Sequence, residues 1–239
     1  MRIVRKLGSA VGALAGVTLA AVALVAAAAS AQDAPGRFAV MPRGGYLRFD
    51  RATSIEPNAA LGLDAMYALT RNFSIGTGLT FSRPQTRGED FIAQISFGDT
   101  TFLLKVTQPI TIVDANVGAM LRLPGRLTPY LLGAIGQYVM YLDPQVNSGS
   151  KKFTHTSGTL GGGFLYHVTD VTGLQLDLRD LIFTKYDRER LRPTQARFAN
   201  TRFPEDVPTL PASKATVHNL MVSLGFSFTP ARPVAEGQP

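Results

Sequence analysis

The sequence contains no cysteine and no tryptophan, only three histidines, and charged residues at just 17% of its 239 positions. Without cysteine, disulfide frameworks, thiolate-ligated zinc, iron–sulfur clusters and thiol catalysis are excluded. Three scattered histidines leave little for a histidine-rich metal site. An apolar content of 45% excludes a disordered chain. No phosphate loop, zinc motif or nucleotide fingerprint is present, so we expect no metal and no cofactor.

The first residues have the pattern of an export signal. A basic start precedes an uncharged segment over 7–32 that is rich in Ala, Leu and Val. This segment ends in a small-x-small cleavage motif, made by Ala29, Ala31 and the following Gln32. We therefore predict a signal-peptide helix over 1–31 that is cleaved after Ala31. The apolar segment is also long enough to span a bilayer, so an uncleaved anchor remains the alternative.

Cleavage would change the charge of the chain. The formal net charge of +7 includes Arg2, Arg5 and Lys6, and without them 21 basic side chains face 17 acidic ones, a net charge of +4. No basic cluster with interleaved aromatic residues appears. We expect no nucleic-acid partner.

After a loose leader over 32–42, the chain alternates between apolar and small or polar residues. Alternation over 73–81 and 219–228 is the clearest, and such a period of two indicates strands. The predicted strands cover 45–50, 58–69, 73–81, 115–123, 128–142, 153–168, 174–179 and 218–228. Short connections at 70–72, 124–127 and 169–172 alternate with longer ones, of which 82–109 and 187–213 are the longest. The segment 91–106 also has strand composition, either as extra barrel strands or as an extension of the wall above a membrane.

This organisation predicts an all-β fold, an eight-stranded antiparallel transmembrane up-and-down β-barrel over 43–229 that follows the signal-peptide helix. Only helices and closed barrels satisfy their backbone groups in hydrocarbon, and tight turns on one rim with long loops on the other are typical of outer-membrane barrels. A soluble calyx of the lipocalin type, with the apolar face inside, is the alternative. Strand length, loop asymmetry and the scarcity of charge on the apolar faces favour the membrane. The polar, proline-rich tail over 230–239 is predicted to be disordered.

Charged residues fall on the strand faces that would point into the barrel. They are Arg48, Asp64, Arg122, Asp177 and Arg179. Because an unpaired buried charge is costly, we expect them to form a salt-bridge network that fills the lumen; a gate in a narrow pore is the alternative. Asp180 breaks the alternation after Arg179, and we expect a β-bulge there to restore it.

The order of signal peptide, eight alternating strands, short turns and long loops resembles the small outer-membrane β-barrels of Gram-negative bacteria, the OmpA-like, OmpX-like and opacity-type proteins. The last strand is similar to the C-terminal signal read by the barrel-assembly machinery. Its alternating apolar positions are Leu220, Val222, Leu224, Phe226 and Phe228. The resemblance implies a monomer in the outer membrane whose partners are outer-membrane lipids, lipopolysaccharide and, during biogenesis, the assembly machinery.

From the resemblance we expect a structural or surface-interaction protein that acts through the long loops 82–109 and 187–213, and not an enzyme. A narrow pore for small or apolar solutes is the first alternative, and a membrane-embedded lipid-modifying enzyme is the second. His155 and Ser157 are similar to the H-x-S arrangement of lipid A deacylases. The alternation of the strand places both residues on the inward face, away from lipid. A polar segment at the rim of the barrel is therefore favoured over a catalytic site.

Overall fold

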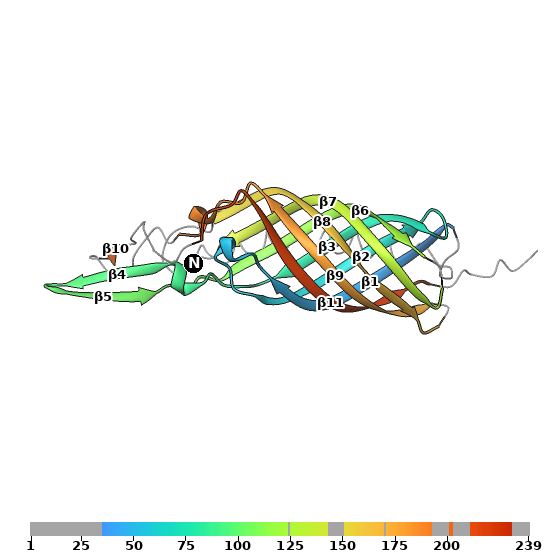
Figure 1. The fold of residues 1–239 in the computed structure, drawn as a ribbon, viewed down its shortest axis with the longest axis horizontal. Coiled ribbons are helices and arrows are strands. Elements are labelled where there is room, and N and C mark those ends of the chain that lie inside the picture. The colour runs from blue at the N-terminus through green and yellow to red at the C-terminus, as the bar shows by residue number, and fades with distance from the viewer. Residues whose placement is uncertain are drawn as a thin grey trace, which may run out of the picture.

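The computed structural model describes residues 35–123, 125–142, 151–169, 171–192, 201–202 and 211–230. Eight antiparallel strands close into a barrel, and a separate three-stranded sheet projects from one end (Figure 1). The barrel strands are β1 (Arg37–Arg48), β2 (Asn58–Ala68), β3 (Phe73–Ser82), β6 (Ile110–Arg122), β7 (Leu127–Leu142), β8 (Lys151–His167), β9 (Thr172–Thr184) and β11 (Thr216–Phe228). The projecting sheet has the order β10 (Thr201–Arg202), β4 (Ile92–Phe97), β5 (Thr100–Lys105).

The barrel has up-and-down topology. Its circular order is β1-β11-β9-β8-β7-β6-β3-β2, so barrel strands that follow one another along the chain are neighbours and β1 closes the ring against β11. We call the rim with the connections at 70–72, 123–126 and 168–171 the turn end, and the opposite rim the loop end. The projecting sheet leaves from the loop end (Figure 1). The predicted eight-stranded barrel is confirmed.

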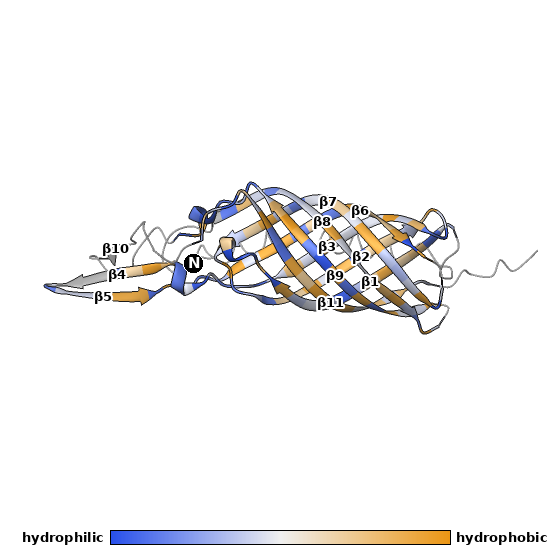
Figure 2. Cartoon of the chain, in the orientation of Figure 1, coloured by the Kyte–Doolittle hydropathy of each residue, from blue (hydrophilic) through white to orange (hydrophobic). Residues whose placement is uncertain are grey.

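The outer face of the barrel is apolar over a broad band. Side chains alternate along every strand, and large apolar ones are exposed, as with Leu131 on β7 and Leu224 on β11. Figure 2 shows orange, hydrophobic segments along the barrel strands. This outward orientation contradicts the soluble calyx, in which the apolar face would point inside. Among the described residues, no helix is long and apolar enough to cross a membrane.

The first strand begins earlier than the sequence predicts. β1 starts at Arg37, within the segment 32–42 that we expected to be a loose leader, and its register with β2 is continuous from Arg37 to Leu47. Pro42 hides this strand in the sequence, because proline lacks an N–H and is unusual inside a sheet. The ladder to β11 shows the same effect: it pairs Val40 and Arg43 but omits the two residues between them.

The inward and outward faces at the end of β1 are exchanged relative to the prediction, which placed Arg48 in the lumen. Leu47 is buried inside the barrel, and Phe49 just after the strand is buried as well, whereas Tyr46 and Arg48 point outward. The lumen near the loop end is lined with apolar side chains, so the apolar residues of this short segment face inward there. The prediction that Arg48 belongs to the lumen is therefore wrong.

The expected bulge at Asp180 is absent. The register between β9 and β11 runs without interruption from Thr172 to Thr184. Leu181 and Phe183 point into the lumen with 1% and 0% exposure, and Asp180 lies on the outer wall, where its carboxylate contacts His218 Nδ1 at 2.7 Å. Inward and outward residues thus alternate regularly along β9. The inward residues change from polar at Arg179 to apolar at Leu181 and Phe183, because the lumen becomes apolar toward the loop end.

The segment 91–106 forms a hairpin outside the barrel. β4 and β5 pair from Ile92–Lys105 to Phe97–Thr100, and β10 adds to the other edge of β4. Of the two possibilities left by the sequence, the structure thus has an extension beyond the wall. The predicted signal peptide 1–31, with Ala29, Ala31 and Gln32, and the tail from residue 231 lie outside the described residues.

Candidate functional site

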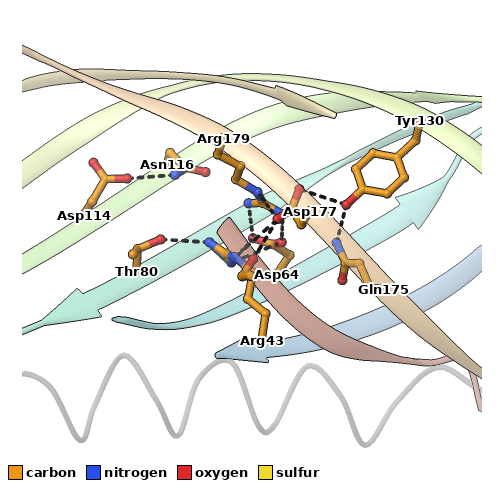
Figure 3. Close-up of polar contacts among 10 residues, drawn as sticks. Arg43, Asp64, Thr80, Asp114, Asn116, Tyr130, Gln175, Asp177 and Arg179 are labelled. Carbon is orange, nitrogen blue, oxygen red and sulfur yellow. Dashed lines mark hydrogen bonds and ion pairs between the residues drawn. The ribbon is translucent and has the colours of Figure 1, made fainter. Parts of the chain in front are cut away.

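A layer of four charged side chains crosses the middle of the lumen (Figure 3). Arg179 on β9 donates from Nη2 to Asp64 Oδ2 on β2 at 2.6 Å and from Nε to Asp177 Oδ2 at 2.5 Å. Arg43 on β1 lies 3.4 Å from Asp64 and 3.7 Å from Asp177. All four side chains are at most 1% exposed. Two positive and two negative charges balance in this layer, which joins three strands across the barrel.

Neutral side chains complete the bonding of this charged layer. Tyr130 on β7 donates its hydroxyl to Asp177 at 2.9 Å and accepts a hydrogen bond from Gln175 Nε2 at 2.7 Å. Thr80 on β3 accepts from Arg43 Nη2 at 2.8 Å. A buried ion pair repays its desolvation only when such additional bonds are made. The layer is therefore a bonded network of strands β1, β2, β3, β7 and β9.

Three of the five predicted lumen charges meet in this layer: Asp64, Asp177 and Arg179. Arg122 also points into the barrel, but it lies at the turn end, and Arg48 points outward. Sequence reasoning missed Arg43, because the first predicted strand began only at residue 45, whereas β1 begins at Arg37. If the first strand is extended across Pro42, Met41 and Arg43 fall on the same inward face. This spacing is the signal in the sequence that could have identified Arg43.

Glycines on the inner face make room for the charged layer. A Cβ atom at Gly62 would lie 2.2 Å from Arg43 Nη1, and one at Gly78 would lie 2.8 Å from Asp64 Oδ1. At Gly161 a Cβ would lie 2.8 Å from Arg179 Cγ and equally close to a backbone oxygen. An eight-stranded barrel is only just wide enough for its side chains. Large charged groups fit because their neighbours across the strands have no side chain.

Beyond the charged layer toward the loop end, the lumen is filled by apolar side chains. This apolar plug is one continuous cluster of buried residues from seven barrel strands and the loops above them. Tyr138 and Phe183 stack at its centre with ring centroids 4.2 Å apart. Its members are Leu47, Phe49, Ala52, Ile55, Ala60, Phe91, Ile110, Ile112, Tyr138, Met140, Leu142, Phe153, Leu181, Phe183, Tyr186, Leu191, Val217 and Met221.

The loops that follow β1, β3 and β9 bond to one another over the plug and form a cap. Tyr186 donates its hydroxyl to the carbonyl of Thr53 at 2.6 Å, and burial raises the pKa of this phenol well above its usual value of 10.0. Gln108 Nε2 donates to the carbonyl of Leu191 at 2.8 Å. Arg51 donates from Nη2 to Asp90 Oδ1 at 2.6 Å. The cap thus ties loops from opposite sides of the barrel across its mouth.

Asp50 anchors the cap to the barrel wall. Its carboxylate accepts from Ala52 N at 2.9 Å and from Lys214 Nζ at 3.1 Å. Partial burial acts to raise the pKa of Asp50, but these two donors outweigh it and lower the pKa below its usual range. Asn219 on β11 accepts from Asp50 N and donates to the carbonyl of Leu181. The cap is therefore continuous with strands β9 and β11.

The hairpin β4–β5 leaves the cap and carries an exposed apolar edge. Every residue of β5 is exposed, and β5 is the edge of its sheet. Leu103 and Leu104 are 63% and 48% exposed, and Lys105 follows them. Ala93, at the base of β4, is buried. A hairpin fixed at its base thus presents large apolar side chains beyond the barrel mouth.

The remaining predicted site residues are also placed. His155 and Ser157 on β8 both face inward: the His155 ring lies 6.1 Å from the ring of Tyr138, and Ser157 is buried. The prediction of inward parity is confirmed. The predicted assembly-signal residues on β11, from Leu220 to Phe228, all lie on the exposed outer face. Their recognition during assembly remains a prediction.

Comparison with known proteins agrees with this geometry. The chain is similar in structure to surface protein A of Neisseria, with a TM-score of 0.53 and 12% identity over 80% of this chain and 96% of that one. OprG from Pseudomonas aeruginosa (TM-score 0.42, 12% identity, 84% of this chain and 100% of that one) and the attachment invasion locus protein Ail of Yersinia pestis (0.41, 11%, 81% and 99%) are more remote. No curated protein matches the sequence.

The family comparison covers most of the sequence. The family model described as "Outer membrane protein beta-barrel domain" matches residues 17–228. The predicted location in the outer membrane is thereby supported by sequence and by fold. This chain belongs to the outer membrane protein β-barrel domain family.

Proposed function

We propose that this protein acts at the cell surface through its hairpin β4–β5, and that its barrel serves as a closed anchor rather than as a channel. In outer-membrane barrels the long loops face the exterior and the short turns face the periplasm. The hairpin leaves from the loop end and thus points away from the cell (Figure 1). The exposed apolar side chains of its strand β5 are the observation that carries the proposal.

The chemistry of the hairpin favours contact with another protein. The exposed side chains of a strand can select an extended polypeptide partner. Exposed apolar patches at a protein surface mark such contacts. Leu103 and Leu104 supply apolar area, and Lys105 supplies a positive charge at their side. We therefore expect a polypeptide partner with apolar and acidic side chains.

The filled lumen supports the anchor role. Among the described residues, the charged layer and the apolar plug occupy the inside of the barrel, and the cap covers the loop end. Solute passage would require buried apolar side chains and paired charges to move together. This favours a closed barrel over a narrow pore.

The experiment compares bacteria that display three forms of the protein at equal surface levels. One form is the full chain, one has residues 92–105 replaced by a short Gly-Ser turn, and one carries Leu103→Ser with Leu104→Ser. Binding is measured on plates coated with an extracellular-matrix protein extract. We expect the full chain to raise binding several-fold over cells without it, and both variants to remove most of that gain. Equal binding by all three forms would contradict the proposal. Leu131→Ser, on the lipid-facing wall, is the matched control for an exposed leucine that does not belong to the hairpin.

A further inference from the structure

A pocket opens at the loop end of the barrel, where β2 and β3 meet their loops. Its lining comes from the segments 56–58 before β2 and 83–85 after β3, and from Pro109 before β6. The backbone N–H of Glu56 donates to the carbonyl of Gln85 at 2.9 Å and joins the two segments. Each of the three parts contributes one proline, whose ring fixes the backbone. A site that is held in place before binding loses little entropy when a ligand enters.

Two opposite charges line this pocket without neutralising each other. They are the carboxylate of Glu56 and the guanidinium of Arg83, and neither forms an ion pair within the part of the chain that the structure describes. Amide side chains hold both in place. Gln85 Nε2 donates to Glu56 Oε2 at 2.7 Å, and Asn58 Nδ2 donates to the carbonyl oxygen of Arg83. The second carboxylate oxygen of Glu56 and the guanidinium of Arg83 are thus available to a ligand.

The pocket lies just beyond the lipid-facing wall. Leu61 and Phe81 pair across β2 and β3, and both are exposed on the outer face. Arg83 follows Phe81 by two residues, is exposed as well, and lies about 7 Å farther along the direction of the strand. Aromatic residues border the apolar band of outer-membrane barrels. The pocket is therefore at the height where the headgroups of the outer leaflet begin.

We propose that this pocket binds the headgroup of an outer-leaflet lipid that carries both a phosphate and a primary ammonium, a phosphoethanolamine group. The guanidinium of Arg83 matches a phosphate in geometry and forms charge-assisted hydrogen bonds with it. The ammonium group, with its three N–H donors, pairs with the carboxylate of Glu56. The volume of about 300 Å³ equals that of about ten water molecules and suits a group of this size. An anionic headgroup without an ammonium would leave Glu56 unpaired, and a quaternary ammonium would offer it no N–H.

Native mass spectrometry of the folded protein in detergent micelles tests this proposal. The protein is titrated with phosphatidylethanolamine, phosphatidylcholine or phosphatidylglycerol, all with the same acyl chains, and the apparent Kd of the first bound lipid is measured. The wild type is compared with Glu56→Gln and Arg83→Gln. Arg48→Gln is the matched control, because Arg48 is exposed on the outer face at the loop end and does not line the pocket. The change in gel mobility on heating verifies that each barrel is folded.

We expect the wild type to bind phosphatidylethanolamine at least fivefold more tightly than the other two lipids. Glu56→Gln should remove this preference, and Arg83→Gln should weaken the binding of phosphatidylethanolamine at least fivefold. Arg48→Gln should change it less than twofold. Equal binding of the three lipids by the wild type would overturn the proposal, and so would a preference that survives in Glu56→Gln or an unchanged Kd in Arg83→Gln.

A competition experiment separates a lipid from a soluble ligand with the same charges. Free phosphoethanolamine is added to the wild-type complex with phosphatidylethanolamine. We expect it to displace the lipid only in at least tenfold molar excess, because it lacks the acyl chains that lie along the apolar wall next to Leu61 and Phe81. Displacement at an equal concentration would assign the pocket to a soluble zwitterion and contradict the lipid as its occupant.

Discussion

The inner and outer faces of the barrel wall are built from alternate residues of the same strands, yet they follow different rules. The outer face is mostly apolar over its central band, where many large apolar side chains are exposed. The inner face is layered: methionines at the turn end, a charged layer in the middle and an apolar plug toward the loop end. An apolar side chain on the outer face contacts lipid and needs no specific partner from another strand. On the inner face each side chain depends on partners from other strands.

The largest expected effect comes from breaking the charged layer. Arg179→Leu would leave the carboxylates of Asp64 and Asp177 in the lumen without their closest cation. Loss of one partner of a buried ion pair costs about 3–5 kcal/mol. We expect the free energy of unfolding in urea, measured in lipid vesicles, to fall by about this amount.

The control for this prediction is Arg48→Leu on the outer face. Arg48 is exposed and has no place in the charged layer, so the change should be within about 0.5 kcal/mol. Equal losses in the two variants would contradict the distinction between the faces.

A smaller effect is expected from two neighbouring glycines of β1. A Cβ at Gly45, on the inner face, would lie 2.2 Å from the carbonyl oxygen of Val222, whereas one at Gly44, on the outer face, would have ordinary contacts. Overpacking of this kind costs about 1–3 kcal/mol. Gly45→Ala should therefore unfold at a lower urea concentration than the wild type, and Gly44→Ala should not. The prediction fails if Gly44→Ala is the less stable variant.

The smallest effect concerns the cap. Tyr186→Phe removes the hydrogen bond to Thr53 and should cost about 1 kcal/mol at neutral pH. Because burial raises the pKa of Tyr186, its phenol ionises first in the unfolded chain, near pH 10. This residue's contribution to stability is thus present below pH 10 and is lost as the pH rises above it.

Unfolding measured from pH 7 to 11 would reveal the effect. Tyr186→Phe should lose less stability above pH 10 than the wild type does. Tyr46→Phe, on the exposed outer face, should follow the wild type across this range. If Tyr186→Phe also followed the wild type, the phenol would not be buried under the cap.

The same comparison explains how far the sequence alone could lead. Alternation predicts strands that face lipid, and it placed the outward residues of β11 and the inward position of Asp64 correctly. It could not predict that the lumen turns apolar after Arg179, because the residues that surround Leu181 and Phe183 come from distant strands and loops. It also missed Arg43, since Pro42 interrupts the local pattern and only pairing with β2 shows the strand to be continuous.

The central claim is that the filled lumen makes the barrel a closed anchor. Single-channel recording of the full-length protein in planar bilayers, with an open porin as the positive control, tests it most directly. We predict a baseline without conductance steps, because the charged layer and the plug fill the lumen. Stable, uniform steps from the folded wild-type protein would contradict the claim.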